Sequence, residues 1–234
     1  MPGGHEFRDY ENVDFDLNGY TVQPGMALSI RQPKNSPGGS GDVSLVEAEN
    51  SRLRVESDDE IRMKRRGDDL VLIVTGDCTI YIPTVLASVS CRLFDGDISA
   101  SDLTVAVTAN TMSGDISLEN VVFGSACVTM SGDIQLRATE FRESSCEVTS
   151  MSGDIALGIP DSWNGTVKAS TMSGSVDVNY PSAKIEDRSG FVGSSIVARI
   201  GESAENSKLR CTTMSGDIDI ESVSTSDAKY AKHS

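Results

Sequence analysis

The feature that most constrains the fold of this chain is a short motif that recurs through its C-terminal half. The commonest form reads Thr-Met-Ser-Gly-Asp-Ile, and the six copies are centred on Gly96, Gly114, Gly132, Gly153, Gly174 and Gly216. Successive glycines are 18, 18, 21, 21 and 42 residues apart, so the last step is twice the one before it. A fixed period of about 20 residues is typical of repeat architectures. The doubled step predicts a degenerate or elaborated repeat near Gly193.

Apolar residues alternate with polar ones on both sides of each glycine. The second residue after the glycine is Ile98, Ile116, Ile134, Ile155, Val176 or Ile218. This period of two, rich in β-branched residues, predicts two short strands joined at a glycine bend, and helical spacing is absent. We therefore predict an all-β fold, a single-stranded parallel β-solenoid whose corners superimpose, coil over coil, in one continuous stack at about 4.8 Å per coil.

The rest of the chain divides around these repeats. Residues 1–10 and 222–234 are polar and are predicted to form tails. Residues 11–83 carry strand-like segments without the full motif, and we interpret them as a β-meander or irregular first coils that cap the solenoid. Residues 84–221 are predicted to form the solenoid itself.

Each residue of the motif has a structural explanation that needs no ligand. Glycine supplies the backbone freedom of the bend, and Ser and Asp beside it are expected to cap the turn. The methionines are expected to point inward and fill the corner: Met112, Met130, Met151, Met172 and Met214. The Thr and Ser hydroxyls would then face outward, an arrangement similar to that of ice-binding solenoids.

The aspartates that follow the glycines are the weak candidates for a metal site. They are Asp97, Asp115, Asp133, Asp154 and Asp217, and Ser175 interrupts the row. Calcium prefers six to eight oxygen ligands, whereas each coil offers one carboxylate in this row. Turn capping is the favoured interpretation and a cation site the alternative. The sequence predicts no cofactor.

Three aromatic residues recur after the strands, at Phe123, Phe141 and Trp163. A row of stacked aromatic rings binds sugar rings in some solenoids, but aromatic side chains more often pack a corner. They are the candidate ligand surface of the chain.

The cysteines and histidines restrict the chemistry. The five cysteines (Cys78, Cys91, Cys127, Cys146 and Cys211) form no Cys-x-x-Cys pair, so we expect buried free thiols. Free thiols favour a cytoplasmic location, and a cell-surface or periplasmic one applies if a targeting segment was removed. The two histidines, His5 and His233, lie in the tails, so we predict no histidine-based catalytic site.

Charge and hydropathy exclude two further classes of protein. Lys and Arg number 20 against 35 Asp and Glu, a formal net charge of −15. Such an acidic chain is a poor ligand for a phosphate backbone, so we predict no nucleic-acid partner. No apolar run is long enough for a transmembrane helix, and the N-terminus does not resemble a signal peptide.

The repeated Ser-Gly-Asp-Ile corner, the Ile82-Pro83 pair before the first full coil and the final Thr212–Ile218 copy resemble a bacterial family of β-strand-repeat domains of unknown function, usually labelled "putative adhesin". The resemblance covers about residues 70–221. It implies a right-handed parallel β-solenoid with no assigned catalytic residues.

These observations predict a non-enzymatic structural or interaction protein, a rigid acidic rod. It would present a binding surface to a protein or glycan, or assemble with itself through the solenoid ends, where backbone groups are unpaired. A carbohydrate-binding module using the aromatic row is one alternative. A polysaccharide-acting enzyme that uses solenoid carboxylates is another.

Overall fold

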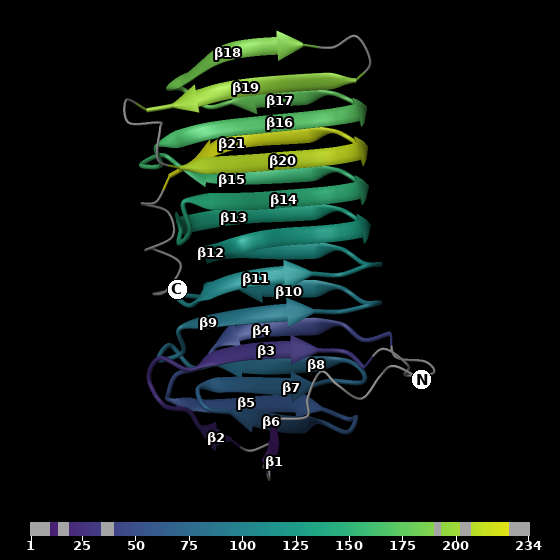
Figure 1. The fold of residues 1–234 in the computed structure, drawn as a ribbon, viewed down its shortest axis with the longest axis vertical. Helices are drawn as coiled ribbons and strands as arrows, with labels where there is room; N and C mark the ends of the chain where they lie inside the picture. The colour runs from purple at the N-terminus through teal and green to yellow at the C-terminus, as the bar shows by residue number, and fades with distance from the viewer. Residues whose placement is uncertain (1–9, 14–18, 34–39, 190–192, 202–206, 225–234) are drawn as a thin grey trace.

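The computed structural model describes residues 10–13, 19–33, 40–189, 193–201 and 207–224. Within these residues the regular secondary structure consists of β-strands, 21 in number. Figure 1 shows the strands lying across the long axis of the molecule in two layers, joined at corners on either side. The all-β prediction is confirmed, and the architecture is β-solenoid-like.

Each layer is a ladder of strands whose order is set by hydrogen-bonded neighbours. From one end to the other the first layer contains β1 (Glu11–Val13), β6 (Arg62–Arg66), β7 (Asp69–Ile73), β3 (Ala27–Arg31), β9 (Ser88–Arg92), β11 (Ala106–Asn110), the second half of β12 (Ile116–Ser131), β14 (Ser145–Ser152), β20 (Lys208–Ser215), β16 (Gly165–Ser173), β19 (Ser194–Ile200) and β18 (Ala183–Ser189). The second layer contains β2 (Tyr20–Thr21), β5 (Arg52–Ser57), β8 (Cys78–Ile82), β4 (Val43–Glu47), β10 (Ile98–Ser101), the first half of β12, β13 (Ile134–Phe141), β15 (Ile155–Pro160), β21 (Ile218–Val223) and β17 (Val176–Asn179).

Neighbouring coils pair in parallel and in register, so equivalent residues of the repeat lie side by side. Ile116 pairs with Ile134, Ile134 with Ile155, and Ile155 with Ile218. Because successive residues of a strand point to opposite faces, one residue in two enters the space between the layers. The buried apolar side chains form one continuous core along the stack.

The order of the coils in space differs from their order in the sequence. The last coil, β20 and β21, lies between the coil of β14 and β15 and the coil of β16 and β17. Figure 1 shows this coil in yellow, between green strands that precede it by several dozen residues. The glycine corners do form one stack, but the Gly216 corner lies between those of Gly153 and Gly174.

The N-terminal region contains a second coil displaced in the same way. Strand β3 pairs in parallel with both β7 and β9, and β4 pairs with both β8 and β10. These residues therefore form irregular first coils rather than a meander, while β1, β5 and β6 pair antiparallel at the outer end. The two coils add glycine corners at Gly41 and Gly76, which we did not predict.

The expectation of a degenerate or elaborated repeat near Gly193 is wrong, because the described residues form no further parallel coil there. Strand β19 runs antiparallel to β16 and to β18, so the chain makes a hairpin over the end of the stack instead of another coil. The 42-residue step is long because the chain runs out and back through this hairpin before it returns to form the last coil.

Candidate functional site

The glycine of the motif occupies a position that no other residue fits. The six motif glycines have φ between +124° and +149°, where side chains are strained. A Cβ atom at Gly132 would also meet the carbonyl oxygen of Gly114 in the neighbouring coil, and the other motif glycines have equivalent contacts. Adjacent corners therefore pack backbone against backbone.

The residue three places before the glycine points inward, contrary to our expectation that this hydroxyl faces solvent. Thr129 is fully buried, and its hydroxyl donates a hydrogen bond of 3.1 Å to the carbonyl oxygen of Gly114. The equivalent bonds join Thr111 to Gly96, Ser150 to Gly132, Thr213 to Gly153 and Thr171 to Gly216. A buried hydroxyl thus satisfies the glycine carbonyl of the neighbouring coil in the stack. Because these hydroxyls are buried, they cannot form a Thr-based ice-binding face.

The aspartate after the glycine bonds the backbone of the neighbouring coil. The backbone N–H of Asp115 donates to Oδ1 of Asp97 at 2.7 Å, and that of Asp133 donates to Oδ1 of Asp115 at 2.8 Å. The row continues through Asp154 and Asp217 and ends where the N–H of Ser175 donates to Asp217 at 2.7 Å. We expected each aspartate to cap the turn of its own coil. Instead, its carboxylate accepts a hydrogen bond from the backbone of the neighbouring coil.

Serine at position 175 follows from the order of the stack. Its coil is the last one with a parallel corner, because the next strand in this layer, β19, runs antiparallel. In the described part of the chain, no further parallel coil follows whose corner N–H would require a carboxylate here. The backbone N–H and hydroxyl of Ser175 both bond Asp217 and lower the pKa of that carboxyl.

The remaining carboxylates of the described residues do not converge on a metal site. No group of three His, Cys, Asp or Glu side chains in the described part of the chain is arranged to hold an ion. Partial burial, followed by the charges of Asp177 and Asp217, raises the pKa of Asp219 on the outer face of β21.

The methionines point outward, so our expectation that they fill the corner is wrong. The side chain before each methionine is inward, and alternation along the strand turns the methionine to solvent. The five side chains are 43–59% exposed, and from coil to coil they follow the order Met112, Met130, Met151, Met214 and Met172. We call these five residues the methionine row. It lies along the edge where β14, β20 and β16 end on the right of Figure 1.

The three aromatic residues lie together, as the sequence suggested. The ring centroids of Phe123 and Phe141 are 5.7 Å apart, and those of Phe141 and Trp163 are 5.6 Å apart. Phe123 is completely buried, whereas the other two rings are partly covered. The geometry is that of a packed corner, with one ring inside the core and two at its margin.

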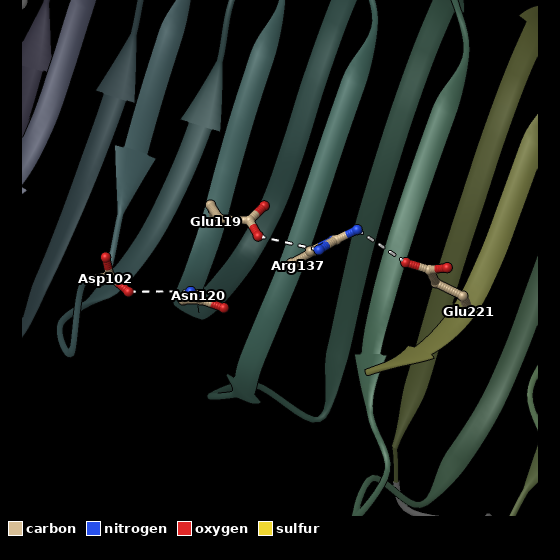
Figure 2. Close-up of polar contacts among 5 residues, drawn as sticks. All are labelled: Asp102, Glu119, Asn120, Arg137 and Glu221. Atoms are coloured by element: carbon tan, nitrogen blue, oxygen red, sulfur yellow. Dashed lines mark hydrogen bonds and ion pairs between the residues drawn. The ribbon is translucent and has the colours of Figure 1, made fainter. Parts of the chain in front are cut away.

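A charged cluster spans several coils on the outer face of the second layer. Figure 2 shows Arg137 between Glu119 and Glu221, with nitrogen–oxygen distances of 3.4 Å to each. Arg137 reaches Glu221 by crossing Gly158 of the intervening strand, where a Cβ atom would meet the arginine side chain. These exposed ion pairs connect the last coil to earlier ones and border a hollow of about 350 Å³.

The five cysteines are buried and free, as predicted. Burial raises the pKa of every one of these thiols, to about 12 for Cys78 and Cys211 and about 11 for Cys146. A thiolate is the reactive form, so the folded protein presents almost none at neutral pH.

We expect Ellman's reagent at pH 8 to modify the folded protein at least about 100-fold more slowly than the urea-unfolded chain. Cys146, whose thiol pKa is raised least, should react first. Equal rates for folded and unfolded chains would show that the thiols are not protected as the structure places them.

The family model described as Toastrack DUF4097 matches residues 35–221 of this chain. The chain belongs to that family. The Toastrack match begins before β4 and ends within β21, so it includes the inserted last coil as well as all eight glycine corners.

One solved structure is similar in fold to this Toastrack chain. It is described as the crystal structure of a "putative cell adhesion protein" from Clostridium sporogenes, with 13% sequence identity and a TM-score of 0.51. The alignment covers 92% of this chain and 100% of that one. The search of curated proteins found no match. Within the described residues, no helix has the length and apolar character needed to span a bilayer.

Proposed function

We propose that this protein is a non-enzymatic interaction protein that binds a partner protein through the methionine row. The observation that carries the proposal is the exposure of five large apolar side chains, one from each of five successive coils. Contiguous exposed apolar surface on a soluble protein commonly marks an interaction site.

The corner does not need methionine for its own stability. The inward hydroxyl, the glycine and the aspartate make the bonds between coils, whereas the methionine side chain lies outside them. Methionine is flexible and polarisable, which suits a surface that adapts to a partner. At about 4.8 Å per coil the row is about 19 Å long, enough to contact an extended segment of several residues.

The charges beside the row indicate the chemistry of the partner. The aspartate row follows the same corners three residues after the methionines, and its members are exposed. The whole chain carries a net charge of −15. We therefore propose a partner segment in which Lys or Arg residues alternate with apolar ones, because such a segment matches both rows at once.

The comparisons support an interaction role in general terms. The family has no assigned activity, and the similar solved structure carries a name that refers to cell adhesion. The proposal includes a single-stranded coil, which the period of the motif indicates, and its right-handed sense, which the family resemblance implies. A second copy of this chain is the competing occupant of the methionine row. The sedimentation measurement described with the peptide titration distinguishes it from a partner protein.

The test uses a synthetic peptide of alternating Lys and Leu, titrated by calorimetry into the full chain. We expect binding that weakens at least about tenfold when Met130, Met151 and Met214 are all replaced with Gln. The same three positions replaced with Leu should retain binding, because Leu preserves the apolar surface. A peptide of alternating Lys and Ser is the matched control for charge alone.

Equal binding of the Leu-containing peptide to the wild type and the Gln variant would overturn the proposal. Concentration-dependent dimerisation of the wild type that the Gln variant lacks, measured by sedimentation, would assign the row to a second copy of the chain instead.

A further inference from the structure

We infer that the methionine row is also a binding site for a soft monovalent metal ion, Cu(I) or Ag(I), held by three consecutive thioethers. The inference depends on the register of the methionines along the row and not on whether a protein docks there. Thioethers are soft, neutral ligands that favour Cu(I) over the hard ions that carboxylates bind.

The register of the corners brings the methionines onto adjacent coils. The serines that follow them pair in parallel across the stack, Ser113 with Ser131, Ser131 with Ser152, and Ser215 with both Ser152 and Ser173. Each methionine therefore lies about 4.8 Å from the next along the row.

A three-sulfur site forms when the two outer side chains of three neighbours converge on the middle one. With a metal–sulfur bond of about 2.3 Å, three sulfurs in a trigonal arrangement lie about 4 Å from one another. The outer two of three consecutive methionines are about 9.6 Å apart at the backbone, so each of their sulfurs must lean about 3 Å toward the middle one. An unbranched side chain with three rotatable bonds can do this while the backbone remains in place. The side chains are about half exposed, so they are accessible to an ion from solvent.

The repetition of methionine at this position favours a role for the sulfur itself. Five of the six motif copies have methionine two places before the glycine, and the first copy has Phe94. The buried position three places before the glycine varies between Thr, Ser and Leu, although packing constrains it more. Apolar docking alone would accept leucine or isoleucine at an exposed site.

The electrostatic setting also favours a cation. The protein carries a net charge of −15, and the aspartate row lies along the same corners. The Oδ1 atoms of that row accept backbone hydrogen bonds, so the aspartates contribute a negative field beside the thioethers.

The order of the row gives the site a specific dependence on one residue. Five positions contain three sets of three neighbours, and Met151, the third position, belongs to all of them. Met172 stands at one end of the row and belongs to one set. This end position follows from the insertion of the Met214 coil between the coils of Met151 and Met172.

The experiment follows the methyl carbon signals of the full chain labelled with [methyl-13C]methionine during titration with silver nitrate in chloride-free buffer. We expect the methionine row signals to shift, while those of the buried Met26 and Met63 stay unchanged. Zn(II) at the same concentrations should shift none of them. Because the methyl group reports on its own sulfur, binding of silver to a cysteine would not mimic this result.

Replacing Met151 with Leu should weaken the apparent affinity for Ag(I) at least about tenfold, and Met172→Leu, the matched control, less than about twofold. Equal losses for the two variants, or no shift of the row in the wild type, would overturn the inference. Replacing Met130, Met151 and Met214 together with Leu should abolish silver binding and keep peptide binding. The two proposals can therefore fail separately.

Discussion

Replacing Gly132 with Ala is expected to lower the free energy of unfolding by about 4 kcal/mol, near the upper end for a single substitution. Two costs combine. The backbone has φ of +146°, and the new Cβ would meet the carbonyl oxygen of Gly114, which is backbone and cannot turn aside. The neighbouring coils must separate locally to admit it. Urea denaturation followed by circular dichroism measures the loss.

Gly67→Ala is the control that isolates the conformational cost. Gly67 has φ of +58°, but a Cβ atom there meets nothing within 4 Å. We expect a loss of about 1–2 kcal/mol, the cost of the left-handed conformation alone. Similar losses at both positions would mean that the close approach of adjacent corners does not constrain the coil.

Truncation before Ser207 is expected to remove the protection of strands far beyond the deleted segment. The last coil supplies the pairing between the β14–β15 coil and the β16–β17 coil in the described residues. Without it, β16 retains only its antiparallel partner β19. We expect amide hydrogen exchange in β16, β17, β18 and β19 to become at least about 100-fold faster, because these strands lose their attachment to the core.

Truncation after Ser224 is the matched control, and it should leave exchange in β16–β19 unchanged. In the full chain, amides of β20 should exchange as slowly as those of β14 despite lying close to the C-terminus. Retained protection of β16 in the chain truncated before Ser207 would show that the last coil is at the end of the stack and not within it.

The coil architecture was predictable because the alternation around each glycine has only one physical reading, two strands and a corner. The order of the coils was not, because the corners are so similar in sequence that the repeat pattern does not show which corner stacks on which. The substitution of Ser175 for aspartate was the available clue. It marks the corner with no parallel neighbour beyond it, but it is interpretable only once the hydrogen bond between coils is known.

The orientation of the methionines was mispredicted for a specific reason. Apolar character suggested an inward side chain, whereas the inward position belongs to Thr129 and its equivalents, whose hydroxyls satisfy glycine carbonyls. The corners at Gly41 and Gly76 were missed because they lack the Thr-Met-Ser segment. Each is still a Gly-Asp pair followed by buried apolar residues two and four places after the glycine, and this shorter pattern would have found them.

The placement of the last coil has a consequence for biosynthesis. When the ribosome has released the chain only as far as β19, strands β16, β18 and β19 form an antiparallel unit with no strand partner in the coils already made. The stack becomes continuous only when Lys208–Val223 have been synthesised. These residues add one strand to each layer, between two coils that were translated earlier. Completion of the stack is therefore tied to the synthesis of Lys208–Val223, and a chain that stops before these residues leaves two unpaired strand edges exposed to aggregation.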